Sequence, residues 1–125
     1  MQKGNRAFEV LEFKNYSGTN DFYSNPEMNS LLGEADHIIV HTPIWESTGT
    51  NVALTVKAED SADNENFAEL NTVISSQPIS PAPVTKRGSV DYPHGRFVRL
   101  KFTLSVTGGA APTANFTCRV SFKDA

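Results

Sequence analysis

The sequence has very little cysteine and no long apolar run. Cys118 is the only cysteine among 125 residues, so no disulfide can form within the chain, and this suits a reducing compartment. No stretch approaches the roughly 20 apolar residues of a membrane-spanning helix. The basic start at residues 1–6 is followed by no apolar segment, which argues against a secretory signal. We therefore expect synthesis in the cytoplasm and no membrane partner.

The motifs of common catalytic and cofactor sites are also missing. The chain has no Gly-x-Ser-x-Gly turn, no His-Glu-x-x-His pair and no glycine-rich phosphate loop before a helix. His37 and His41 would share one face of an extended strand, but about 13 Å apart, which is too far for one metal ion. Cys118 alternates with apolar residues, so we expect a buried, unreactive thiol. We predict no enzymatic activity, no cofactor and no metal site.

The charge of the chain says little about which partner it binds. The net charge of −3 comes with no basic cluster, so we expect no nucleic acid to bind. The acidic segment 60–66 includes Asp60, Asp63 and Glu65, whose oxygens are of the kind that calcium prefers. It lacks the spacing and the glycine of an EF-hand loop. We interpret it as a solvated hairpin loop and keep calcium as the alternative.

Period-two patterns predict strands over much of the chain. In residues 95–107 every second residue is apolar, which predicts a half-buried strand with one face in the core. The members of this row are Val98, Leu100, Phe102, Leu104 and Val106. Further strands are predicted at residues 7–14, 37–46, 52–59, 67–74 and 115–122. Because Pro43 cannot donate to a ladder, we expect strand 37–46 at a sheet edge or bent at that residue.

Two segments fit no simple strand. Residues 15–36 are rich in Asn, Ser, Gly and Asp, and within them residues 27–32 are expected to form one helical turn that Gly33 ends. Residues 77–85 hold Pro78, Pro81 and Pro83, which favour an extended crossing over the surface between two sheets.

Together these patterns predict an all-β fold, an antiparallel, jelly-roll-like β-sandwich, with a closed barrel as the second choice. We divide the chain into an irregular N-terminal arm and loop segment, residues 1–36, and a sandwich domain, residues 37–125. The strand at 7–14 would be either an edge strand or part of the arm, because Val10 and Leu11 interrupt its alternation.

Two segments resemble small β-sandwich structural proteins of tailed bacteriophages. Residues 54–70 run from a strand through a Ser-x-Asp-x-x-x-Phe hairpin, and residues 96–105 begin with Arg-Phe-Val-Arg. The resemblance covers about residues 50–122. The hairpin of these proteins usually carries Asp-Gly where this chain has Asp63 and Asn64.

The resemblance implies a virion structural protein, most directly a capsid decoration (cement) protein bound to the outside of a phage head. It implies the major capsid protein and neighbouring copies of the chain as partners, a homotrimer, and a location on the capsid surface after synthesis in the host cytoplasm. The alternatives are a carbohydrate-binding module that holds a surface glycan, and a head-completion or tail ring component.

Aromatic residues supply the candidate partner-binding set. Trp45 and Phe97 fall opposite the apolar rows of their own strands, and exposed aromatics stack on sugars or anchor protein interfaces. The carbohydrate alternative adds Tyr92. Aromatics of residues 1–36 join the set because we expect that segment to dock on the capsid or on an adjacent copy. The partner-binding set is Phe8, Phe13, Tyr16, Phe22, Tyr23, Trp45 and Phe97.

Overall fold

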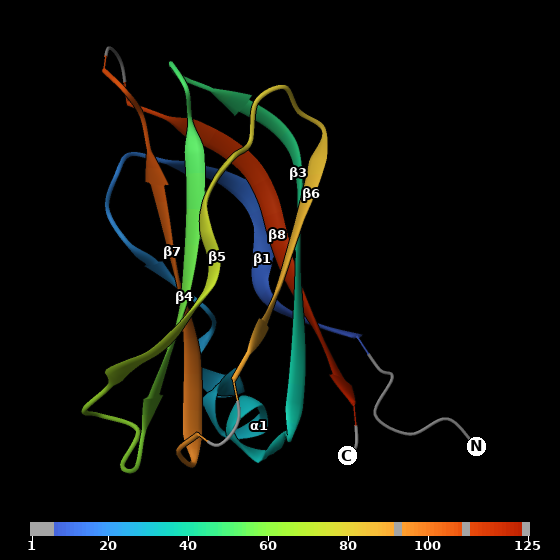
Figure 1. The fold of residues 1–125 in the computed structure, drawn as a ribbon, viewed down its shortest axis with the longest axis vertical. Coiled ribbons are helices and arrows are strands. Elements are labelled where there is room, and N and C mark those ends of the chain that lie inside the picture. Colours follow the sequence, from blue (N-terminus) through green and yellow to red (C-terminus); the bar gives the residue numbers. More distant parts are fainter. Residues whose placement is uncertain (1–6, 92–93, 109–110, 124–125) are drawn as a thin grey trace.

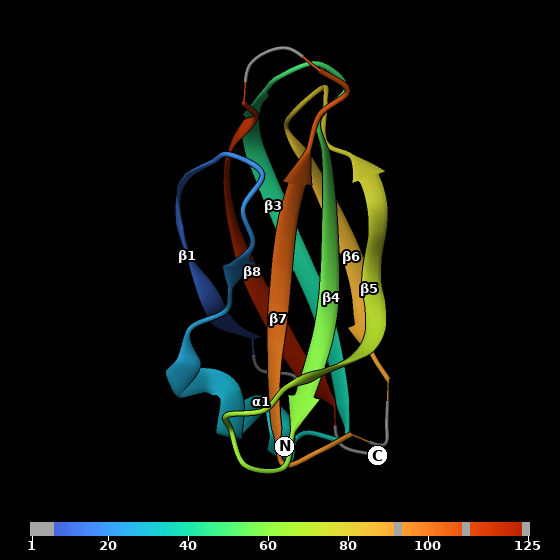
Figure 2. The same cartoon turned by 90° about the vertical axis from the view of Figure 1, so that its left-hand side faces the viewer.

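Two four-stranded antiparallel sheets pack face to face in the computed structural model, which describes residues 7–91, 94–108 and 111–123 (Figures 1 and 2). Sheet A has the strand order β1-β8-β3-β6, and sheet B has the order β2-β7-β4-β5. The strands are β1 (Ala7–Ser17), β2 (Phe22–Tyr23), β3 (His37–Thr48), β4 (Ala53–Ser61), β5 (Ala68–Pro78), β6 (Val84–Val90), β7 (Phe97–Ser105) and β8 (Thr113–Lys123). This confirms the predicted all-β sandwich.

The core lies between the sheets and includes the apolar row of β7. Val98, Leu100, Phe102 and Leu104 are each 0 % exposed, as the alternation predicts. Phe102 reaches Phe116 of β8 in the opposite sheet, with ring centroids 6.1 Å apart. Full burial of such a side chain is worth about 1.5–3 kcal/mol, so this row is a main source of the sandwich's stability.

Most of the segment predicted to be an N-terminal arm is part of the sandwich. β1 pairs with β8 along its whole length, and β2 pairs with β7. The β1–β8 register shifts on both sides of Leu11, so Val10 and Leu11 are both buried, because a bulge places consecutive side chains on one face. Residues 7–14 were predicted to form either an edge strand or part of an arm, and the edge strand is confirmed. The division at residue 36 is therefore corrected to one sandwich that includes β1; residues 1–6 lie outside the described residues.

A short helical segment lies across one end of the sandwich (Figure 1). The 3₁₀ turn η1 (Pro26–Met28) leads into α1 (Asn29–Glu34), which confirms the predicted helical turn. Leu32 is 0 % exposed and belongs to the core cluster. Gly33 lies inside α1 rather than after it, and a Cβ there would come within 1.7 Å of the Arg96 carbonyl oxygen. The helix thus rests directly on the backbone that enters β7.

β3 is a central strand, so the predicted edge position is wrong. It pairs with β8 on one side and with β6 on the other. Pro43 lies opposite Thr85 of β6. On the other side of β3, the pairing with β8 gives Pro43 no partner, and its register shifts between Ile44 and Glu46. The irregular β8 side accommodates a residue that cannot donate, and a bulge beside Pro43 agrees with the bend that the sequence predicted.

The proline-rich crossing between the sheets is confirmed. It leaves β5 in sheet B after Pro78 and enters β6 in sheet A at Val84, with Ile79 fully buried on the way. β6 itself was not predicted, because only Val84 and Val90 at its ends are clearly apolar. The two-residue strand β2 was also missed, since it is too short to show a period.

Candidate partner-binding surface

Three of the predicted partner-binding aromatics are exposed. Phe13 is 53 % exposed, Trp45 47 % and Tyr23 42 %. These are the exposed large apolar side chains of the described residues. Phe8, Phe22 and Phe97 are half-buried, and Tyr92 of the carbohydrate alternative lies outside the described residues.

Tyr16 is a core residue and is dropped from the partner-binding set. Only 4 % of it is exposed, and its ring packs against Phe22 and Phe116 with centroids 5.0 and 4.7 Å away. Its hydroxyl donates to the Glu12 carbonyl oxygen at 2.6 Å. Burial, with the nearby Glu12 and Glu9 carboxylates, raises the pKa of Tyr16 to about 12. From the sequence alone Tyr16 and Phe13 cannot be told apart, because both lie in a strand whose register shifts.

Phe13 and Trp45 form an aromatic pair on the outer face of sheet A. They come from β1 and β3, with β8 between those strands, yet their ring centroids are 5.0 Å apart in an edge-to-face arrangement of 77°. Each lies where its strand shifts register against β8, and such bulges re-aim side chains. Thr117 of β8, the strand between them, is 1 % exposed and donates to the Leu11 carbonyl oxygen at 2.6 Å. Two half-exposed rings, each beside a bulge, thus meet across β8.

The same outer face carries a row of basic side chains. Arg87 of β6 lies opposite His41 of β3, and His41 lies opposite Arg119 of β8. Beside Arg87 are two adjoining shallow hollows over β3 and β6, which Ile39 and Ser89 line in common. The sequence does not reveal this row, because β6 shows no apolar period and the strand order cannot be read from the pattern.

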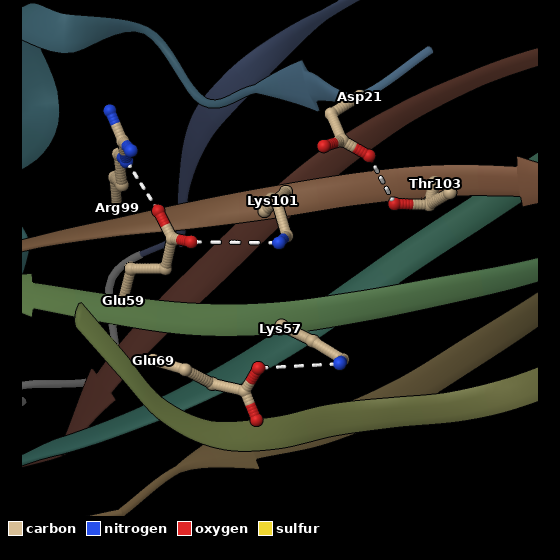
Figure 3. Close-up of polar contacts among 7 residues, drawn as sticks. All are labelled: Asp21, Lys57, Glu59, Glu69, Arg99, Lys101 and Thr103. Atoms are coloured by element: carbon tan, nitrogen blue, oxygen red, sulfur yellow. Dashed lines mark hydrogen bonds and ion pairs between the residues drawn. The ribbon is translucent and has the colours of Figure 1, made fainter. Parts of the chain in front are cut away.

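The outer face of sheet B differs in that its charged side chains pair with one another (Figure 3). Glu59 accepts from Arg99 at 2.7 Å and lies 3.6 Å from the Lys101 ammonium, while Lys57 and Glu69 are 3.3 Å apart. The Arg99 guanidinium also lies over the Tyr23 and Phe67 rings, 4.3 and 4.1 Å from their centroids. The ring of the exposed Tyr23 is therefore already in contact with an arginine of the same chain.

The acidic loop after β4 is organised by its own hydrogen bonds. The Ser61 hydroxyl accepts from the backbone N–H groups of Asp63 and Asn64, at 3.1 and 2.9 Å. The Asp63 carboxylate accepts from the backbone N–H groups of Glu65 and Asn66, both at 2.9 Å. These bonds hold the pKa of Asp63 well below its usual range. Within the described residues, no group of three or more His, Cys, Asp or Glu side chains is placed to hold a metal ion.

Cys118 is fully buried, as its alternation predicted. Its sulfur accepts a weak hydrogen bond from the Thr42 hydroxyl at 3.8 Å, and burial raises its pKa to about 12. A thiol in this state is a poor nucleophile, because the thiolate is the reactive form. In the described part of the chain no helix has the length and apolar character needed to span a membrane.

Comparison with known proteins identifies the fold. No family model and no curated protein sequence matches the chain. Among solved structures, VP2 in the subviral particle of infectious bursal disease virus is similar, with a TM-score of 0.61 and 11 % identity. The match covers 94 % of this chain and 32 % of that one, so this protein spans about a third of the VP2 chain.

A second similar structure is the CBM22-1 xylan-binding domain of Paenibacillus barcinonensis Xyn10C. Its TM-score is 0.56 at 14 % identity, and the match covers 100 % of both chains. At these identities the similarity defines a class of fold: a β-sandwich domain of the kind found in a viral capsid protein and in a carbohydrate-binding domain. The resemblance to tailed-phage decoration proteins has no support from a sequence family.

Proposed function

We propose that this protein is a non-enzymatic structural component of a virion, a decoration protein that binds the outer surface of a phage capsid through the outer face of sheet A. The observation that carries the proposal is the exposed Phe13–Trp45 pair. The sandwich fold, which VP2 of infectious bursal disease virus also has, is consistent with it. The major capsid protein is the partner that this face contacts.

The aromatic pair has the character of an interface anchor. Its two rings are about half exposed and support each other edge to face, so they enter an interface already positioned. Aromatic anchors near the centre of an interface typically cost 2 kcal/mol or more when truncated to alanine. A loss of 2 kcal/mol corresponds to a dissociation constant roughly 30-fold larger.

The test is co-sedimentation with capsids of the virus that encodes this chain, purified from a mutant that lacks the gene. Wild-type protein should sediment with the particles, and Trp45→Ala and Phe13→Ala should each bind about 30-fold more weakly. Tyr23→Ala is the matched control, because Tyr23 is similarly exposed but lies on sheet B. Failure of the wild-type protein to bind would refute the proposed function. Equal binding by all four proteins would refute the role of sheet A.

We also propose that the protein assembles as a homotrimer in contact with neighbouring copies on the capsid. Closed symmetric assemblies are the common form of homo-oligomers, and a three-fold position of a capsid lattice would fit a trimer. Light scattering after size exclusion should give three times the 13.7 kDa chain mass. A monomer both in solution and on the capsid would contradict this part.

Carbohydrate binding is the second candidate, favoured by the same aromatic pair and by the fold shared with a xylan-binding domain over its full length. Trp45 would then stack on a sugar ring. Affinity electrophoresis in xylan gels and a glycan array test this function. Retardation of the wild-type protein that Trp45→Ala abolishes would support it, and the absence of any glycan hit would remove it.

A further inference from the structure

The basic row on sheet A places two arginine side chains near each other on the outer face. Arg87 and Arg119 lie on either side of His41 on three adjacent strands, so the Cβ atoms of each opposite pair are about 4.5–5.5 Å apart. Within the described residues neither arginine side chain has a hydrogen bond or an ion pair. The two guanidinium groups start from strands that are two apart, roughly 10 Å, with His41 between them. Among the described residues the row therefore adds no ion pair to the isolated sandwich.

Sheet B shows that this arrangement is specific to one face. There Glu59 lies between Arg99 and Lys101, and Lys57 is paired with Glu69, so each of these cations has a carboxylate within 3.6 Å (Figure 3). The face that carries the exposed aromatic pair is the one that leaves its arginines unpaired.

The carboxylate nearest in register to the row does not pair with it among the described residues. Glu9 of β1 lies opposite Arg119, but its carboxylate lies 3.2 Å from the Thr117 hydroxyl, whose shorter hydrogen bond goes to Leu11. Glu9 forms no ion pair with Arg119 among the described residues. Asp91 lies at the rim of the hollow between β3 and β6, again without an ion pair to Arg87 in the described part of the chain. The guanidinium groups therefore remain available to carboxylates from outside.

The row continues the surface of the aromatic pair. His41 and Trp45 lie on the same strand, four residues or about 13 Å apart. The hollows beside the row are open to solvent, and two unpaired guanidinium groups suit carboxylates better than the hydroxyls of a neutral glycan. A protein partner would place its apolar residues against the rings and its carboxylates against the arginines.

We infer that the surface bound by the outer face of sheet A is an acidic patch of a protein, whose carboxylates are received by Arg87 and Arg119 beside His41. This rests on the proposed function, where that protein is the capsid subunit. Arginine forms paired hydrogen bonds with carboxylates, which adds orientation as well as affinity. The aromatic pair supplies the anchor, and the row selects the partner by charge.

The first test measures capsid binding by the charge reversals Arg87→Glu and Arg119→Glu. Each should bind at least 10-fold more weakly than Arg96→Glu, the control, which makes the same net charge change at an exposed position outside sheet A. Circular dichroism checks that all variants are folded. If both reversals bind like the control while Trp45→Ala is weakened, the inference is overturned and the proposed function stands.

A second test needs no capsid. A glutamate-rich peptide is titrated into ¹⁵N-labelled protein and followed by NMR, with an oligogalacturonide in a parallel titration. Peptide-induced shifts on β3, β6 and β8 that Arg87→Glu abolishes would support the inference even if capsid binding fails. Shifts with the oligogalacturonide alone would overturn it in favour of an acidic glycan. No shifts with either probe at millimolar concentration would overturn it as well.

Discussion

Replacing Gly33 with alanine is expected to destabilise this protein, although the same change in an ordinary helix is favourable. In an exposed helix interior, alanine is better than glycine by about 0.5–1 kcal/mol, because glycine loses more backbone freedom on folding. Gly33 lies inside α1, but its missing side chain faces β7. A Cβ would come within 1.7 Å of the Arg96 carbonyl oxygen and 2.8 Å of the Phe97 backbone nitrogen.

The size of the effect follows from this contact. Non-bonded carbon and oxygen atoms need roughly 3.4 Å, so α1 would have to move away from β7 by well over an ångström. Leu32, the next residue, is 0 % exposed in the core and resists that movement. Overpacking of this kind costs about 1–3 kcal/mol or more, which exceeds the helix-propensity gain. The net loss lowers the melting temperature by roughly 4–10 °C for a domain of this size.

Chemical and thermal unfolding measure the effect, with Ser30→Ala as the control. Ser30 is exposed on the same helix, so its replacement should change the free energy of unfolding by less than about 0.5 kcal/mol. If Gly33→Ala is as stable as the wild type or more stable, the reasoning is refuted. That result would mean that α1 is not held against β7, and that the segment before β3 is looser than the structure shows.

Three further predictions concern single side chains. Cys118 should react with a thiol reagent at pH 8 only as fast as the protein unfolds, because burial raises its pKa to about 12; rapid labelling of the native protein would contradict this. Asp63→Asn should reduce stability at pH 7. Because the folded-state pKa of Asp63 lies below its unfolded value of about 3.9, the difference from wild type should persist above pH 5 and shrink as the pH falls towards 2 in denaturant titrations. Arg99→Met should destabilise by about 1–3 kcal/mol, since it leaves Glu59, 9 % exposed, with only the longer Lys101 contact; an unchanged unfolding midpoint would count against this.

The sandwich was predictable because its strands carry an apolar face. The rows of β3, β4, β7 and β8 alternate over most of their length, and each of these strands appears close to its predicted bounds. β6 is a strand for a different reason: its backbone pairs with β3 while its side chains are mostly polar. Such a strand is specified by its neighbours, so its own sequence shows little period.

The position of β3 shows the same limit. Pro43 argues for an edge strand when hydrogen bonds alone are considered. The structure instead places β3 in the middle of sheet A and puts a bulge beside the proline. Strand order depends on which faces and turns fit together in three dimensions, and one strand's sequence does not contain that information.

The candidate site was predictable residue by residue but not as an arrangement. The sequence predicts both Phe13 and Trp45 as partner-binding residues, but nothing in it brings together residues 32 positions apart on strands separated by β8. Their contact depends on two bulges. Recognising the basic row likewise requires the register of three strands. The sequence alone therefore gives no indication that Arg87 and Arg119 lie near each other.

The integration of β1 into sheet A determines how attachment has to be tested. If the first 36 residues were a free arm, removing residues 2–20 would isolate the arm's contribution to binding. In the structure that deletion removes the edge strand that covers β8, together with the buried Val10 and Tyr16. Binding would then be lost whether or not the segment contacts a capsid, because the sandwich itself would be disrupted. Phe13→Ala avoids this ambiguity: its ring is more than half exposed, so its removal leaves the β1–β8 ladder in place and changes only the surface that a partner would meet.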